Sequence, residues 1–488
     1  MKNKDILLDV IGDVDEDLIP ELSSVKKKKG RIIKRTAIGG GICAAALIAW
    51  VMLLPNSTFS KTMGNDNTML LASAVYPEMP TYPDESEYPD WEEFEPIYDE
   101  WREANLDLKN QPEGYKDGFD TFFYNSSRTF LADAGTDNKV YSPLSLFMAL
   151  SMSAEISDGN TRQQILDVLS QDDIDSLRSH AKSIWLANYM NDGMAKCVLA
   201  NSLWTNSNIP YTQSTIDSIA GNYYSSVYSG DPASDKYNRL MQDWINEQTD
   251  GLLSDYVSDI KMDSEMVLTL ASTVNFSGKW NHKFSKDLTA PGVFHSPAGD
   301  IECDFMNSER DTSYFWGDKF AAVSMYLENN GHMRLILPDE GITPEDLIND
   351  DSAIGYMMNT NEYSSDKYVN NKFVTVNLSV PKFDISSNID LKDGLEKLGI
   401  TDAFDPYNSD FSPLTEQSDG VFISKVEQDT RVIIDEDGCK ASSLTIMIAD
   451  GAAMPDDYVY FTLDRPFIFE IMSETGLPLF IGIVNNPK

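Results

Sequence analysis

The sequence has few residues of the kinds that bind metals or form disulfide bonds. Only four cysteines and four histidines occur among its 488 residues. Cys43 lies within an apolar run, which leaves Cys197, Cys303 and Cys439 as an odd, scattered set, so no disulfide framework is implied. The histidines are equally dispersed, and neither H-E-x-x-H nor C-x-x-C occurs. We therefore expect no metal and no other cofactor.

Sequence motifs of common enzymes are also absent. There is no G-x-S-x-G elbow, no G-x-x-x-x-G-K-[ST] phosphate-binding loop and no G-x-G-x-x-G after a strand. A Ser-His-Asp triad could still assemble through space, since triads are recognised by geometry. The missing motifs argue against catalysis without excluding it.

Positive charge is scarce. The chain has 38 Lys and Arg against 78 Asp and Glu, a formal net charge of −40. Binding to a phosphate backbone needs clustered Lys and Arg that release counterions, so nucleic acid is not an expected partner. The acidity mainly favours solubility.

One basic cluster, at residues 26–35, directly precedes an uncharged run at 36–54. The run is near the lower end of the roughly 17 to 25 residues that cross a bilayer, and its basic flank places the N-terminus in the cytoplasm. The pattern predicts a cytoplasmic segment at 1–35, a transmembrane signal anchor at 36–54 and an extracellular remainder. Secretion after cleavage of a signal peptide is the alternative, although no small-x-small site closes the run.

Residues 55–110 shift to proline, aromatic residues and acid, as at 76–84 and 91–96. This composition predicts an extended, self-repelling spacer, with the start of a helix near Asp99 to Leu106. The aromatic residues leave a docking segment, and thus an adhesion protein, as alternatives.

The most informative stretch lies near the C-terminus. A strand-like run at 432–434 meets Asp-Glu-Asp-Gly and then a tract of mostly small residues at 439–448. The tract lacks Pro and Gly and carries β-branched residues, so it could become a strand. Residues 449–457 break the pattern with Gly, Pro and acid, which provides the accessible segment that a protease needs. A loop able to join a sheet suggests stored conformational energy.

Short motifs surround this stretch in a fixed order. They are Y-S-P-L-S at 141–145, G-N-T-R at 159–162, W-I-N at 244–246, F-S-G-K-W at 276–280, V-P-K-F-D-I at 380–385, L-G-I-T-D-A-F at 398–404, D-R-P-F-I-F at 464–469 and F-I-G-I-V-N-N-P at 480–487. Together they resemble the serpin family of serine protease inhibitors, from about Gly114 to the C-terminus. With the apolar run, they suggest a membrane-anchored, bacterial-type member.

The resemblance implies an α+β fold over residues 111–488, with a large central sheet, two further sheets, surrounding helices and an exposed reactive-centre loop. It implies an inhibitor, not an enzyme. A protease attacks the loop and forms an acyl-enzyme, and the freed part of the loop inserts as an extra strand before the acyl bond is hydrolysed. The partner would be a serine protease in a covalent complex with a monomeric inhibitor. No basic run occurs around Gln171 to Lys182, so no polyanion cofactor is expected.

Insertion requires alternate side chains that fit a packed core, because strand residues point to opposite faces with a period of two. One face would be mostly small and consist of Cys439, Ala441, Ser443, Thr445 and Met447. The other would carry Lys440, Ser442, Leu444, Ile446 and Ile448. This pattern favours an inhibitory serpin.

The hinge of the loop departs from the family pattern in places. Glu436 and Gly438 match the usual acid and glycine, but Cys439, Lys440 and Leu444 replace the usual Thr, Glu and Ala. A hinge that inserts slowly would be cut as a substrate. A non-inhibitory serpin that binds or carries a ligand is therefore the alternative.

The resemblance also implies a cleavage site. The family's usual spacing from the hinge glycine, here Gly438, implies a scissile bond between Ala452 and Ala453. Counting back from the motif at 464–467 makes other residues candidates, namely Gly451, Met454 and Pro455. Ala or Met before the cut would fill a small apolar pocket, which favours elastase-like or subtilisin-like serine proteases over trypsin-like ones. A cysteine protease is the alternative target.

Two further residues match the region where the loop enters the sheet. Trp280 matches the family's tryptophan there, and Lys382 matches the lysine that pairs with Glu436. Without a functional role they would be a core aromatic residue and a surface ion pair worth roughly 0 to 1 kcal/mol.

Ser142 and Ser145 match the family's serines beneath the centre of the sheet. Their expected partners are changed, because Ser272 stands where Asn is usual and Gln428 where His is usual. Both replacements can still form hydrogen bonds.

Overall fold

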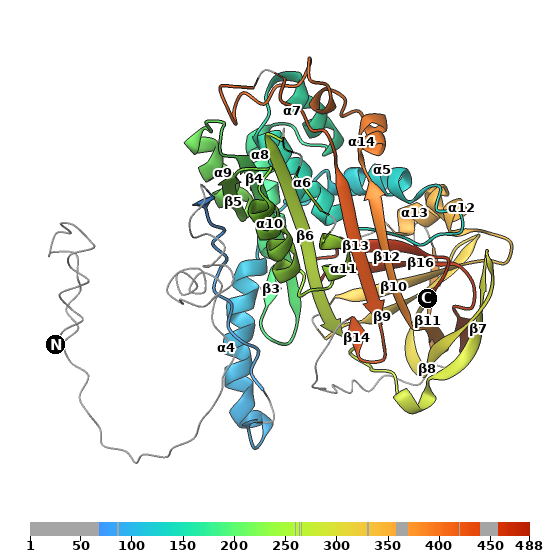
Figure 1. Cartoon of the computed structure of the whole chain (residues 1–488). Helices are drawn as coiled ribbons and strands as arrows, with labels where there is room; N and C mark the ends of the chain where they lie inside the picture. Colours follow the sequence, from blue (N-terminus) through green and yellow to red (C-terminus); the bar gives the residue numbers. More distant parts are fainter. Residues whose placement is uncertain are drawn as a thin grey trace, which may run out of the picture. The chain divides into compact units, whose positions relative to one another are not determined.

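The computed structural model describes residues 68–84, 87–258, 260–262, 264, 266–328, 331–357, 369–418, 420–439 and 457–488. These residues form three sheets with helices around them (Figure 1). The α+β architecture predicted from the sequence is confirmed.

Several of the helices begin where a short polar side chain caps them. Ser142 accepts a hydrogen bond from the backbone N–H of Ser145, and Asp173 accepts one from that of Ser176. The helices in the described residues are α4 (Trp91–Lys109), α5 (Phe119–Leu131), α6 (Pro143–Glu155), α7 (Gly159–Val168), α8 (Ile174–Asn188), α9 (Gln213–Tyr223), α10 (Asp235–Gln248), α11 (Ser254–Val257), α12 (Pro344–Ile348), α13 (Asp351–Met357) and α14 (Lys392–Leu398), with short 3-10 turns η3 (Lys286–Leu288) and η5 (Asp402–Phe404).

The first sheet has six strands in the order β1-β5-β4-β6-β14, with β3 on β4. They are β1 (Met69–Ala72), β3 (Met190–Asn191), β4 (Lys196–Asn206), β5 (Ser225–Gly230), β6 (Leu268–Lys279) and β14 (Gly438–Cys439). β4 is buried along almost its whole length, as expected of a central strand covered on both faces. β6 is only partly buried over its first residues.

The second sheet has nine strands in the order β15-β11-β8-β9-β10-β16-β17-β2, with β7 on β8. They are β2 (Lys139–Tyr141), β7 (Ala290–Ser296), β8 (Gly299–Trp316), β9 (Phe320–Tyr326), β10 (His332–Pro338), β11 (Asn370–Pro381), β15 (Tyr458–Thr462), β16 (Phe467–Met472) and β17 (Pro478–Val484). β16 and β17 are entirely buried and belong to the core.

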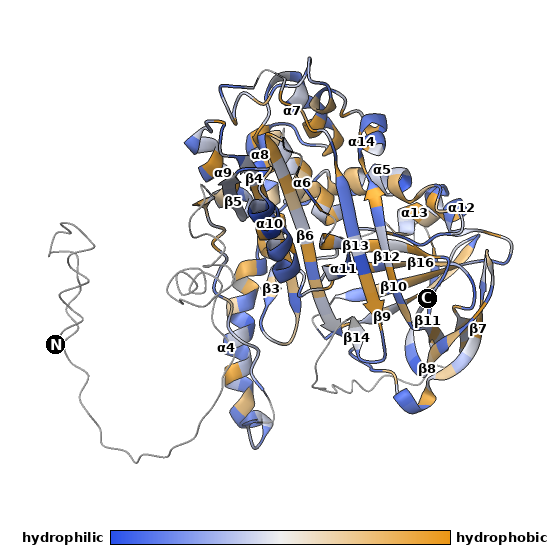
Figure 2. Ribbon diagram, viewed as in Figure 1, coloured by the Kyte–Doolittle hydropathy of each residue, from blue (hydrophilic) through white to orange (hydrophobic). Residues whose placement is uncertain are grey.

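The third sheet consists of β12 (Phe383–Asp390) and β13 (Glu427–Ile434), paired antiparallel. β13 alternates buried and more exposed residues, so one face packs inward. Figure 2 shows that β13 is hydrophilic where it starts and hydrophobic where it ends, which matches Glu427–Ile434. β14 follows β13 in the chain but pairs with β6, in the first sheet.

The segment predicted to be an extended spacer contains a strand and a long helix in the residues that the structure describes. β1 pairs antiparallel with β5, and α4 begins at Trp91, behind its cap Asp90, instead of near Asp99. Tyr76 packs against the rings of Trp185 and Tyr189, with centroids 5.0 and 5.7 Å away. β1 and α4 are thus packed elements within the range predicted to be a self-repelling spacer, and burial of aromatic residues such as Tyr76 offsets the cost of ordering the chain there.

The localisation predicted from the sequence, a single-pass membrane protein with an extracellular domain, is also corrected. In the part of the chain that the structure describes, no helix is both long and apolar enough to cross a membrane. The longest helix mentioned above, α4, has 19 residues but carries acidic side chains from its first turn onward. The segments at 1–35 and 36–54 lie outside the described residues.

Candidate functional site

An open space separates β6 from β13. A cavity of about 960 Å³ lies between them, and α6 and α11 contribute to its lining. β6 pairs with β4 along its other edge, and β13 pairs with β12. Within the described ranges, the facing edges have no strand partner except where β14 meets the end of β6. We call this cavity the slot, with residues 268–275 and 427–431 as its edges.

The slot has the geometry of a missing strand. An edge without a partner presents a row of N–H and C=O groups that can pair with another strand. Here two such edges line one cavity, and Figure 1 shows β6 and β13 running alongside each other. A single extended segment placed between them could pair on both sides.

The middle of the slot lies over the N-terminal end of α6. The hydroxyl of Ser145 donates to the carbonyl oxygen of Ser272 on β6 at 3.0 Å, and the two hydroxyl oxygens are 3.3 Å apart. The side chain of Gln428 on β13 accepts from the Ser142 N–H at 2.7 Å and donates to the Ser142 carbonyl at 3.0 Å. The structure thus brings the two serines predicted beneath the centre of the sheet together with Ser272 and Gln428, which were predicted as their partners. α6 is bonded to both edges of the slot.

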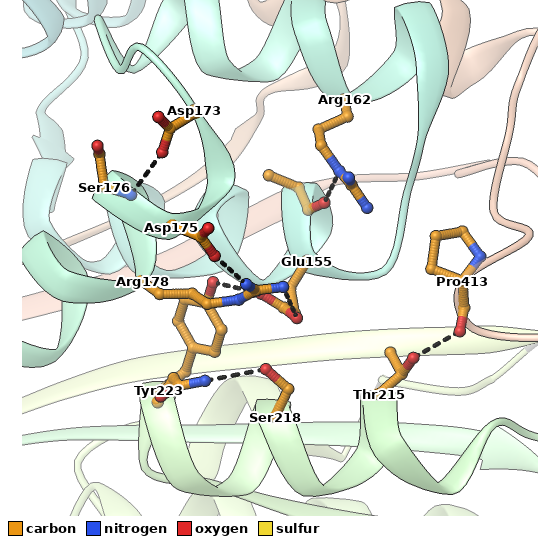
Figure 3. A network of polar contacts seen from close by, with 12 residues as sticks. Glu155, Arg162, Asp173, Asp175, Ser176, Arg178, Thr215, Ser218, Tyr223 and Pro413 are labelled. Atoms are coloured by element: carbon orange, nitrogen blue, oxygen red, sulfur yellow. Dashed lines mark hydrogen bonds and ion pairs between the residues drawn. The ribbon is translucent and has the colours of Figure 1, made fainter.

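The other end of α6 is fixed by a polar network (Figure 3). The buried carboxylate of Glu155 accepts two hydrogen bonds from Arg178 on α8, at 2.7 and 2.9 Å, and one from the Tyr223 hydroxyl on α9 at 2.9 Å. Burial alone would raise the pKa of Glu155, but these donors, Arg178 first, bring it below its ordinary value. Three helices are joined at this point, so the floor of the slot is held at both ends.

At the end of β6, the residues after β13 turn and enter the first sheet. Gly438 pairs with Lys279 and Cys439 with Gly278, antiparallel to β6. Gly438 has φ of +144°, and a Cβ there would lie 2.4 Å from the carbonyl oxygen of Gly278. Only glycine fits this position without strain. The hinge has therefore already begun a strand on β6, next to the slot.

Trp280 and Lys382 hold the turn before β14, as the sequence suggested. The fully buried Trp280 donates from its indole N–H to the carbonyl oxygen of Asp435 at 2.9 Å. The Lys382 ammonium lies 2.9 Å from the carboxylate of Glu436, which also accepts from the Thr289 hydroxyl at 2.9 Å. Burial by itself would raise the pKa of Glu436. The hydrogen bonds to its carboxylate, that of Lys382 first, outweigh this effect, so the pKa is below its ordinary value and the acid stays ionised.

Most of the predicted loop lies outside the residues that the structure describes. Of the hinge, Glu436, Gly438 and Cys439 lie in the described part of the chain. The remaining hinge residues lie outside it, namely Lys440, Ala441, Ser442, Ser443, Leu444 and Thr445. So do the residues around the predicted cut, Gly451, Ala452, Ala453, Met454 and Pro455.

Sequence reasoning missed two contacts at the slot. Asp437 pairs with Lys286 at 3.1 Å, although 151 positions separate them in the chain. Arg431 on β13 forms a two-pronged ion pair with Asp384 on β12, with two N–O distances of 2.8 Å, and donates to the carbonyl oxygen of Leu252. The run of three acids before Gly438 was the available signal for the first contact, but nothing in the sequence indicated its partner.

A match to the family described as "Serpin (serine protease inhibitor)" spans residues 119–487. This match covers more than half of the chain, so the chain belongs to the serpin family. Serpins as a family are protease inhibitors, not enzymes.

Individual relatives agree with this assignment. The chain is 28% identical to a putative serpin-Z12 of Oryza sativa subsp. japonica over 375 residues, covering 72% of this chain and 85% of the relative. It is 26% identical to alpha-1-antiproteinase of Rattus norvegicus, covering 75% and 87%. The native state of tengpin, a thermophilic serpin, superposes with a TM-score of 0.67 at 27% identity, covering 78% and 95%. These comparisons support the family, but not the membrane-anchored, bacterial type expected from the sequence.

Proposed function

We propose that this protein is an irreversible, suicide-substrate inhibitor of serine proteases, carried by the domain at residues 111–488. The single observation that carries the proposal is the slot, with the hinge already paired to β6 just beyond the slot's edge. After cleavage, the released part of the loop would continue this pairing and fill the slot. The protease, still attached as an acyl-enzyme, would be carried along and trapped.

The register of β14 supports insertion of the small face of the loop. Cys439 pairs with Gly278. Six residues further along the loop and six residues back along β6, Thr445 comes opposite Ser272. Directly opposed residues on antiparallel strands point to the same face. Because Ser272 faces Ser145 on α6, the residues from Cys439 to Thr445 on that face would point into the molecule.

That inward face is the one that carries small side chains. Between Cys439 and Thr445 it consists of Ala441 and Ser443, which add little volume over α6. A bulky or charged inward face would require the packed helix to move, since protein interiors leave little free space. Lys440 falls on the opposite, outward face, where its charge can stay in water.

The expected cut lies between Ala452 and Ala453, with Gly451, Met454 and Pro455 as the alternative positions. No Lys or Arg occurs between Ala441 and Arg465, which disfavours trypsin-like enzymes. A small apolar residue before the cut suits elastase-like or subtilisin-like serine proteases. A cysteine protease with similar specificity is the alternative target.

A denaturing gel tests the proposal. The protein is mixed with an elastase-like serine protease, and a covalent band of the summed mass supports trapping. Complete cleavage of the loop with no such band would reject inhibition and leave the second candidate, a non-inhibitory serpin that binds or carries a ligand. That candidate draws on Cys439, Lys440 and Leu444, the departures from the family hinge. Mass spectrometry of the released C-terminal peptide locates the cut.

A further inference from the structure

Three consecutive acids form the turn between β13 and β14, and their side chains have different partners. Asp435 folds back and accepts from backbone N–H groups within the turn, at 2.9 and 3.2 Å. Glu436 pairs with Lys382, which lies between β11 and β12. Asp437 reaches instead to the chain that follows β6, where it pairs with Lys286 at 3.1 Å. Of the three carboxylates, Asp437 is thus the one that forms an ion pair with the segment that follows β6.

The attachment of Asp437 to this segment involves both its side chain and its backbone. A second cation, Lys283, lies 4.0 Å from the Asp437 carboxylate. The carboxylate raises the pKa of Lys286 through their hydrogen bond. The carbonyl oxygen of Asp437 accepts from the backbone N–H of Trp280 at 3.3 Å. Three residues that follow β6 therefore hold one residue of the hinge.

The position of Asp437 matters because insertion of the cleaved loop competes with hydrolysis of the acyl-enzyme. Fixing the backbone of each residue of a new strand costs roughly 1 to 2 kcal/mol before neighbouring contacts repay it. The first residues are the least favourable to fix, since they have no ordered neighbour to extend. In this structure Gly438 and Cys439 are already paired with β6, so growth of the strand starts from an existing register.

We propose that Asp437 is a positioning residue for loop insertion. Its ion pairs with Lys283 and Lys286 keep Gly438 and Cys439 in register on β6, so that the cleaved loop enters the slot before the acyl bond is hydrolysed. The inference rests on the proposed function, because it assumes that the cleaved loop inserts. Glu436 forms its ion pair on the opposite flank, with Lys382, and contacts the segment after β6 through hydrogen bonds from the Thr289 hydroxyl and the Phe284 N–H.

The test measures the ratio of cleaved inhibitor to covalent complex with an elastase-like protease. Asp437→Asn and Lys286→Gln should each raise this ratio roughly two- to fivefold, the change that an exposed ion pair supports. Asp437→Glu keeps the charge and should restore most of the trapping. The matched control is Asp351→Asn, which removes an exposed ion pair with Arg128, of 2.7 Å, outside the slot lining and should leave the ratio unchanged. Salt near 1 M, where the Debye length is about 3 Å, should narrow the difference between Asp437→Asn and the unaltered protein.

Hydrogen exchange of the free protein supplies a second readout that needs no protease. Asp437→Asn should speed exchange of the peptide that contains Gly438 and Cys439, and Asp351→Asn should not. An unchanged or lower ratio in Asp437→Asn, together with unchanged exchange, would overturn the role of Asp437. If the unaltered protein traps no serine protease, the proposed function fails, and the exchange experiment alone then decides whether Asp437 holds the hinge.

Discussion

Replacing Gly438 by alanine should convert the inhibitor into a substrate. The backbone at Gly438 has φ of +144°, and an added Cβ would lie 2.4 Å from the Gly278 carbonyl oxygen and 2.7 Å from the Lys279 Cα. Both obstacles are backbone atoms of β6, so no side chain can move aside. The hinge must leave the strand to accommodate the methyl group.

The size of the effect follows from two costs. A non-glycine residue in such a sparsely populated region costs roughly 1 to 3 kcal/mol, and overpacking against fixed atoms costs about as much again. A combined cost of about 2 to 6 kcal/mol lowers the population of the paired hinge by at least roughly 30-fold. Overall stability should change little, because β14 contains only two residues.

The assay is the ratio of cleaved inhibitor to covalent complex, measured with an elastase-like protease. Gly299→Ala is the matched control, since Gly299 has φ of +124° and a Cβ there would meet nothing within 4 Å. In Gly299→Ala the backbone is strained in the same way, but the added Cβ meets no other atom. The residue lies at the start of β8, in the second sheet. Gly438→Ala should give almost only cleaved protein, whereas Gly299→Ala should trap normally. Normal trapping by Gly438→Ala would refute the reasoning.

Three other predictions concern stability. Burial raises the pKa of Glu470 to about 7 from an ordinary 4.5, so the folded protein holds a proton there that the unfolded chain has released. Buried Arg334, 3.6 Å away, opposes this shift in the pKa of Glu470 but does not cancel it. Unfolding free energy should therefore fall as the pH rises from about 4.5 to 7, and Glu470→Gln should remove this part of the urea-denaturation pH profile. Gln428→Leu should cost about 1 to 3 kcal/mol in the same assay, because the peptide groups of Ser142 lose their partner; an unchanged midpoint would contradict the bridge. Tyr76→Ala should release residues 69–83, seen as faster hydrogen exchange there with little change in the peptide spanning β13; uniform exchange changes would contradict local attachment.

Local sequence patterns predicted the elements next to the slot well. The strand-like run at 432–434 forms the end of β13, and the turn of acids with Gly438 lies where the sequence suggested. Ser142 forms hydrogen bonds with Gln428 and Ser145 with Ser272, the residues that the family resemblance named as partners of the two serines. The strand and the turn depend on short segments with strong local preferences, whereas the pairing of the serines with residues 127 and 286 positions away came from the family resemblance.

Features that depend on distant partners were not predictable. The composition of residues 55–110 matches that of solvated chains and therefore predicts a spacer, whereas the rings that pack on Tyr76 come from residues more than 100 positions away. The ion pair of Asp437 joins segments separated in the same way. The predicted localisation is wrong for a different reason, since it rests on the composition of one local apolar run alone.

The most direct test of the account is hydrogen exchange at the edges of the slot, before and after the loop is cleaved by an elastase-like protease. If the cleaved loop becomes a strand between β6 and β13, amides at 268–275 and 427–431 should gain protection together, and the thermal unfolding midpoint should rise. Exchange at both edges that stays as fast after cleavage as before would contradict the central claim that the slot receives the loop.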